Sequence, residues 1–217
     1  MANNNKKTHI NKKPLQQGAT AILVAAVLVI FCYFFVDRQV VIWVYFHRLP
    51  EDWFLNYFSQ IAGGISILAF ITFIVVIIRY FCQKIQRIDK LMMIAAMSVV
   101  ISDFFAEALK IVFGRYWPAT WNNNLSFITD SAYGFQWFHG GVSASFPSGH
   151  TTITLAAMTI LWLAAPRLRW LAILVGALQI IGLIGMNYHF VGDTIGGGVL
   201  GWLVAYYTWL WCQNINK

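Results

Sequence analysis

The chain has 217 residues, of which 59% are hydrophobic and only 11% are charged, and its formal net charge is +7. Soluble globular domains are usually about 45–50% apolar and about a quarter charged. The composition therefore excludes a soluble enzyme, a disordered protein and a nucleic-acid-binding domain. It indicates a polytopic helical membrane protein.

Six apolar runs follow one another along the chain. A bilayer crossing takes about 20 predominantly apolar residues in a helix. Because the sixth run ends close to Lys217, little chain remains for a second domain. We expect an all-α fold, a six-transmembrane-helix bundle, as a single domain over 17–217 behind a cytoplasmic tail of 1–16. The runs lie at about 17–36, 56–78, 91–113, 148–165, 170–188 and 194–212.

Lysine and arginine gather in alternate connections between these runs. The positive-inside rule assigns such basic connections to the cytoplasm, so we expect both termini there and no nucleic-acid partner. Successive runs then cross the membrane in alternating directions, starting from the cytoplasm. This alternation places the end of the third run, the start of the fourth, the end of the fifth and the start of the sixth on the outer face. The clustered basic residues are Lys6, Lys7, Lys12, Lys13, Arg79, Lys84, Arg87, Lys90, Arg167, Arg169 and Lys217.

The third run carries ionisable residues near its outer end. Asp103, Glu107 and Lys110 are spaced i, i+4 and i+7, so they share one helix face. Ionisable groups inside a membrane are costly and usually face a bundle interior or a wet cavity. The alternative is a stripe of charge pairs that only holds helices together. Arg115 follows at the outer edge, and two cations at a water-facing helix end indicate an anion site of the kind that binds phosphate.

The start of the fourth run reads Phe146-Pro147-Ser148-Gly149-His150-Thr151. Pro147 before a helical run is a start signal, and Ser148 suits an N-cap. Backbone N–H groups at a helix N-terminus can bind an anion, and Gly149 lets the backbone approach it closely. His150 would lie beside that anion. Alone, Pro-Ser-Gly is also ordinary turn chemistry.

His189 and Asp193 stand four residues apart before the sixth run. A carboxylate at this distance can orient the ring through Nδ1–H and leave Nε2 as a free lone pair, which is how histidine nucleophiles are activated. A structural histidine at a helix end, paired with a capping aspartate, is the alternative.

Together these segments supply a nucleophile, its orienting carboxylate, a second histidine as acid, two cations and a helix N-terminus. Phosphoryl transfer through a phosphohistidine needs such a set. Over residues 105–200 the motifs resemble the type 2 phosphatidic acid phosphatase superfamily, whose membrane branch has six helices. The resemblance implies that His189 attacks phosphorus, that Asp193 orients it and that His150 protonates the leaving group.

Two arginines of the family pattern are missing from this chain. The first family motif is a lysine, six residues, an arginine and a proline, and Trp117 occupies the arginine position. The third motif places Ser-Arg before five residues and the histidine, where this chain has Gly182 and Leu183. The groups left to bear a phosphate's charge are Lys110, Arg115 and the amides near Ser148 and Gly149.

These features predict a lipid phosphate or pyrophosphate phosphatase, embedded in an inner membrane, that forms a phosphohistidine at its periplasmic face without metal or cofactor. A polyprenyl, glycerolipid or lipid A phosphate would each fit as the substrate, surrounded by membrane lipids.

Other function classes stay open. A lipid phosphoryl or headgroup transferase would use the same His189 with a lipid or sugar acceptor, and the aromatic-rich segment 114–147 would then be a lid instead of an interfacial loop. A transporter or scaffold would use the polar residues to line a path, but the broken helices and inverted repeats of transporters are not visible. A metal site from His139, His150 and His189 lacks the usual short ligand spacing, and we expect His139 to be a loop residue.

Overall fold

The computed structural model describes residues 12–82, 84–122, 133–141 and 144–215. Regular structure in these ranges is helical apart from one antiparallel bridge between Arg115 and Phe135, so the predicted all-α class is confirmed. The elements are α1 (Lys13–Phe35), α2 (Asp37–Phe46), the 3-10 turn η1 (Leu49–Glu51), α3 (Trp53–Ser59), α4 (Ile61–Phe81), α5 (Arg87–Phe113), α6 (Pro118–Asn122), α8 (Gly149–Ala164), the 3-10 turn η2 (Pro166–Leu168), α9 (Arg169–Gly185) and α10 (Val191–Ile215).

Four stretches of the described chain are long and apolar enough to cross a membrane: α1, α3 with α4, α5, and η2 with α9. Each of the six predicted runs corresponds to a helix, but the count of six crossings is not confirmed. The helix α8 has only 16 residues, or about 24 Å at 1.5 Å per residue. The helix α10 has 25 residues and is not one of these four stretches.

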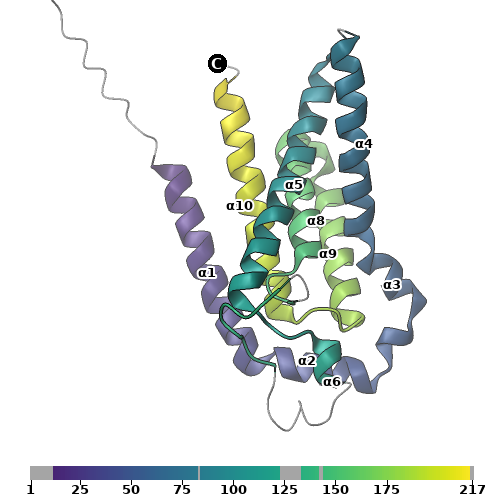
Figure 1. Ribbon diagram of the computed structural model, residues 1–217, viewed down its shortest axis with the longest axis vertical. Coiled ribbons are helices and arrows are strands. Elements are labelled where there is room, and N and C mark those ends of the chain that lie inside the picture. The colour runs from purple at the N-terminus through teal and green to yellow at the C-terminus, as the bar shows by residue number, and fades with distance from the viewer. Residues whose placement is uncertain (1–11, 83, 123–132, 142–143, 216–217) are drawn as a thin grey trace, which may run out of the picture.

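The connections predicted to carry the chemistry lie at one end of the bundle (Figure 1). The short helices α2, α3 and α6 lie at this end, drawn at the bottom, whereas the start of α1 and the end of α10 lie at the opposite end. The segment expected to be a connection at 37–55 folds into α2, η1 and the start of α3. Short helices at this end of the bundle therefore take the place of a plain loop.

Local sequence signals determine where the helices end or begin at this end of the bundle. The helix α5 ends at Gly114, whose φ of 55° is the left-handed conformation that glycine adopts without strain. The helix α8 begins after Ser148, whose Oγ accepts the N–H of Thr151 at 3.3 Å. Both ends agree with their sequence signals.

The helices α8 and α10 pack closely because α10 presents glycine to α8. A Cβ atom on Gly197 or Gly201 would collide with the carbonyl oxygens of Ser148 and Thr152. The hydroxyl of Thr152 also donates to the carbonyl of Gly197 at 3.0 Å. Glycine at these positions permits the close packing of the two helices, and it holds the start of α8 against the start of α10.

A buried glutamine joins the break between α3 and α4 to the bundle. Gln179 on α9 is fully buried, accepts the N–H of Ala62 at 2.8 Å and donates to the carbonyl of Ser59 at 3.0 Å. These two bonds satisfy backbone groups that the break would leave unpaired in an apolar setting.

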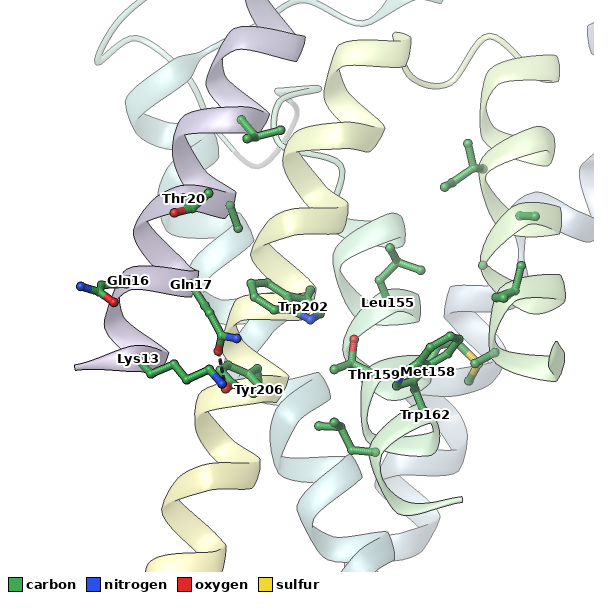
Figure 2. A pocket seen from close by; sticks show the side chains of 18 residues that line it. Lys13, Gln16, Gln17, Thr20, Leu155, Met158, Thr159, Trp162, Trp202 and Tyr206 are labelled. Carbon is green, nitrogen blue, oxygen red and sulfur yellow. Dashed lines mark hydrogen bonds between the residues drawn. The ribbon is translucent and has the colours of Figure 1, made fainter. Parts of the chain in front are cut away.

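Apolar grooves flank α1, which packs mainly against α10, and two of them differ in the residues that line them. The larger, of about 1100 Å³, lies among α1, α8, α9 and α10, and Figure 2 shows Lys13, Gln17 and Tyr206 together at one end of it. Its lining on α8 runs from Leu155 to Leu163 and does not include His150. The smaller, of about 590 Å³, is lined by α1, α5 and α10 and reaches Phe146 and Pro147, directly before Ser148.

Candidate active site

The N-terminus of α8 is one part of the candidate site. Ser148 is fully buried, and its N–H donates to the carbonyl of Asp193 at 3.1 Å, which ties α8 to α10. The N–H groups of Gly149 and His150 are the first two of the helix and have no acceptor within it. The side chain of His150 is exposed. This arrangement suits an oxyanion next to His150.

Lys110 lies against the same helix start. Its Nζ contacts Glu107 Oε1 at 2.6 Å, and the side chain of Lys110 is 9% exposed. A Cβ atom on Gly149 would stand 3.5 Å from this Nζ, so the absence of a side chain there lets the amine approach the helix terminus. Asp103 interacts electrostatically with both Glu107 and Lys110. Of the predicted charged stripe of α5, Glu107 and Lys110 therefore lie at the start of α8 and pair with each other.

His189 lies in the connection between α9 and α10 and is 1% exposed. Its ring centroid is 6.3 Å from that of His150 and 4.7 Å from that of Trp117. Neither ring nitrogen hydrogen-bonds to a described residue. The Nδ1 atom stands 3.6 Å from Asp193 Oδ2, which is an ion-pair approach and too long for a hydrogen bond. The ring of His189 is thus buried, with the ring of His150 near it and the carboxylate of Asp193 next to Nδ1.

The backbone of this connection is held by the end of α9. The carbonyl of Leu183 accepts the N–H of Tyr188 at 3.0 Å, and Asn187 adopts a φ of 53°. The side chain of Leu183 is fully buried. A buried apolar side chain therefore stands where the family pattern has a phosphate-binding arginine.

Asp193 is fully buried and has partners on both oxygens. Oδ1 accepts Nη1 of Arg115 at 2.7 Å, and Oδ2 accepts the N–H of Phe190 at 3.0 Å. These bonds hold the carboxylate in one orientation with Oδ2 toward His189. The two side chains approach each other as their spacing predicts, but the expected hydrogen bond from His189 Nδ1 to Asp193 is not formed in this structure.

Arg115 does not fit the expected contact with a substrate phosphate. Its side chain is 0% exposed, its Nη2 donates to Asp37 Oδ2 at 2.7 Å, and its guanidinium carbon lies 3.9 Å from the ring centroid of Phe190. Burial acts to lower the pKa of this guanidinium, but Asp193 and Asp37 outweigh it, and the pKa lies above its ordinary value. We therefore correct the expectation: Arg115 is a charged bridge behind the site.

Two other residues and one segment bear on the sequence-based expectations. Asp37 was not predicted as a site residue; its signal was a lone carboxylate directly after the first apolar run. His139 is an exposed residue whose Nδ1 lies 2.7 Å from the carbonyl oxygen of Trp137, as expected for a loop. Part of the aromatic-rich segment 114–147, including Asn123, Asn124 and Phe127, lies outside the described residues. Within the described ranges, no three His, Cys, Asp or Glu residues gather as a possible metal site.

Comparison with known proteins identifies the family. Residues 91–217 match the model of the PAP2 superfamily. The chain belongs to the PAP2 superfamily. The matched segment holds Lys110, Ser148, Gly149, His150, His189 and Asp193, so the resemblance drawn from the motifs is confirmed at the level of the family.

A solved structure shares the fold. The crystal structure of a transmembrane PAP2-type phosphatidylglycerolphosphate phosphatase from Bacillus subtilis superposes with a TM-score of 0.57, over 94% of this chain and 98% of that chain, at 18% identity. At this identity the likeness concerns the fold. A search of curated protein sequences finds no match.

Proposed function

We propose that this PAP2 protein is a membrane-embedded lipid phosphate or pyrophosphate phosphatase that works through a phosphohistidine. The observation that carries the proposal is the enclosed ring of His189, with two unbonded ring nitrogens, 6.3 Å from His150 at the start of α8. Lys110 and the first N–H groups of α8 provide positive potential at the same place. The solved relative is a phosphatidylglycerolphosphate phosphatase, which supports a phospholipid monoester as substrate.

The proposed reaction has two steps. The Nε2 atom of His189 forms a bond to phosphorus while the ester bond breaks, and His150 gives its proton to the leaving lipid alkoxide. Water then attacks the phosphohistidine, His150 takes a proton from that water, and the nitrogen–phosphorus bond breaks to release phosphate. Lys110 and the N–H groups of Gly149 and His150 stabilise the charge on the equatorial oxygens. This scheme uses no metal, and we expect activity to survive excess EDTA.

The membrane arrangement is part of the proposal. We infer six crossings by a single domain over 17–217, with the tail 1–16 and the C-terminus in the cytoplasm and the site at the periplasmic face of an inner membrane. The start of α8 and the connection between α9 and α10 lie at the end of the bundle opposite the start of α1 and the end of α10 (Figure 1), which supports this arrangement. A substrate chain would lie in the groove that reaches Phe146 and Pro147.

The test uses purified full-length protein in detergent with phosphatidic acid, phosphatidylglycerol phosphate, a polyprenyl pyrophosphate and a lipid A phosphate. We expect phosphate release from at least one lipid. Because phosphohistidine is labile in acid and stable in base, an acid quench should show no phosphorylated enzyme. A rapid alkaline quench should trap phosphohistidine in the wild type and not in His189→Ala. Label persisting in His189→Ala would place the nucleophile elsewhere. Transfer to a lipid or sugar acceptor without free phosphate would favour the transferase, and no turnover of any lipid would favour a transporter or scaffold.

A further inference from the structure

Asp37 contacts the candidate site although it lies outside the family-matched segment. It is the first residue of α2 and is fully buried. Its Oδ2 accepts Nη2 of Arg115 at 2.7 Å, and its Oδ1 accepts the N–H of Gly192 at 3.0 Å. Gly192 directly precedes Asp193, so both oxygens of Asp37 bind elements that hold the carboxylate behind His189.

A continuous path of charged groups connects Asp37 to His189. Arg115 contacts Asp37 through Nη2 and Asp193 through Nη1, both at 2.7 Å, and Asp193 Oδ2 lies 3.6 Å from His189 Nδ1. Each of these four residues is at most 1% exposed. Salt and water therefore screen these charges little, and removing one of them should change the electrostatic potential at His189.

The charge balance gives Asp37 a specific effect on His189. Arg115 carries one positive charge and meets two carboxylates, so the three groups together carry a net charge of about −1 when all are ionised. Without Asp37, the guanidinium would cancel the charge of Asp193. With Asp37 sharing the guanidinium, Asp193 keeps negative potential toward His189. Such potential stabilises the positive charge that develops on the ring as Nε2 bonds to phosphorus.

We propose that Asp37 is a positioning residue of the PAP2 site: through Arg115 and Gly192 it holds Asp193 and maintains negative charge behind His189. The inference rests on the proposed function for its kinetic consequences. Its effect on the protonation of His189 does not depend on turnover. A merely structural anchor for α2 would change stability but leave His189 protonation unchanged.

The first measurement is NMR titration of the full-length protein in detergent, labelled in its histidine rings, with the His189 signal assigned by His189→Gln. The groups that face His189 are His150 from α8 and Asp193 from α10, with Arg115 and Asp37 behind them; Lys110 and Glu107 of α5 act on His150. Removing negative charge disfavours the protonated ring. Asp37→Asn should therefore move the His189 midpoint to lower pH.

The second measurement is lipid phosphate release as a function of pH. In Asp37→Asn we expect kcat to fall roughly ten- to hundredfold, the range typical when a group that orients an active-site ligand is removed. KM should change little, and the acid limb of kcat/KM should move to lower pH. If the wild type releases no phosphate from any lipid, the proposed function fails while the NMR titration still decides this inference.

The chain offers a matched control. Asp89 is 4% exposed, pairs with Arg79 at 2.9 Å and lies at the opposite end of α5, about 31 Å from Lys110 by the helical rise. Asp89→Asn removes a similarly buried, paired carboxylate and should leave the His189 midpoint unchanged. Equal shifts in both variants, or no shift in Asp37→Asn, would overturn the proposal.

A double variant keeps the test decisive if Asp37→Asn does not fold. Asp37→Asn with Arg115→Gln removes the guanidinium together with one of its two carboxylate partners. The three residues 37, 115 and 193 then carry the same net charge as in the wild type. We expect its His189 midpoint to return toward the wild-type pH, whereas kcat should stay low because Asp193 has lost its bridge. A double variant with wild-type kcat would contradict the positioning role.

Discussion

At the residue scale, the enclosed position of Arg115 leaves Lys110 as the side-chain cation at the start of α8 in the described part of the chain. The Nζ atom of Lys110 also donates a hydrogen bond to Glu107 Oε1 at 2.6 Å. Binding of a phosphate therefore has to compete with this carboxylate. The positive potential of the site consequently depends on one lysine and on the helix N-terminus.

This dependence makes Lys110→Ala a sharp test of the site. A hydrogen bond to a charged group contributes about 1.5–3 kcal/mol, so kcat/KM for a lipid phosphate should fall roughly ten- to hundredfold. Lys90→Ala removes an exposed lysine from the other end of α5 and should have wild-type kinetics. Kinetics of Lys110→Ala equal to those of Lys90→Ala would mean that Lys110 only pairs with Glu107.

At the element scale, the position of the site depends on how closely α10 approaches α8. Gly197 faces the carbonyl of Ser148, the residue that caps α8. Close packing here sets the distance between the helix start and the connection that carries His189. The contact of two backbones is thus a structural requirement of the site as well as of the fold.

Gly197→Ala should therefore impair both stability and activity. Overpacking commonly costs about 1–3 kcal/mol, so we expect a lower thermal midpoint in detergent together with reduced phosphate release. Gly63→Ala on α4 is the matched control, because nothing lies within 4 Å of its added Cβ atom. Since alanine is the better helix former, that variant should be at least as stable as the wild type. Equal midpoints for the two variants would contradict the close contact.

The two grooves beside α1 offer another test at this scale. Ala26 lines the groove next to Pro147, and Ala177 lines the larger groove at the far end of α8; both alanines are exposed. If the first groove holds the substrate chain, Ala26→Trp should raise KM for a long-chain lipid phosphate. It should not raise KM for a short, water-soluble phosphate ester. A matching rise in Ala177→Trp would show a general effect of the bulky side chain.

At the scale of the whole molecule, the parity of the crossings decides which side of the membrane the site faces. A reporter fused after Lys217 should behave as cytoplasmic, and one inserted in the segment 120–130 should behave as periplasmic. Both outcomes follow from six crossings with a cytoplasmic start. A periplasmic C-terminal reporter would contradict the six-crossing proposal and the outward-facing site with it.

The sequence by itself predicted the helical class, the family and the segments that meet at the site. Helix periodicity placed Asp103, Glu107 and Lys110 on one face, and local capping rules placed Ser148 at the start of α8. These features depend on interactions within a few residues, so the order of the residues determines them. Spacing likewise predicted the approach of His189 to Asp193, four positions away.

Only the tertiary structure decided the role of Arg115. Its partners Asp37 and Asp193 are each 78 residues away along the chain, and no local pattern says which carboxylates a buried guanidinium will meet. The sequence therefore favoured a phosphate contact for Arg115, whereas packing of α2 against the start of α10 surrounds it with carboxylates and aromatic rings. A buried charge must be paired by groups that the fold brings to it, and that pairing is a property of the folded chain.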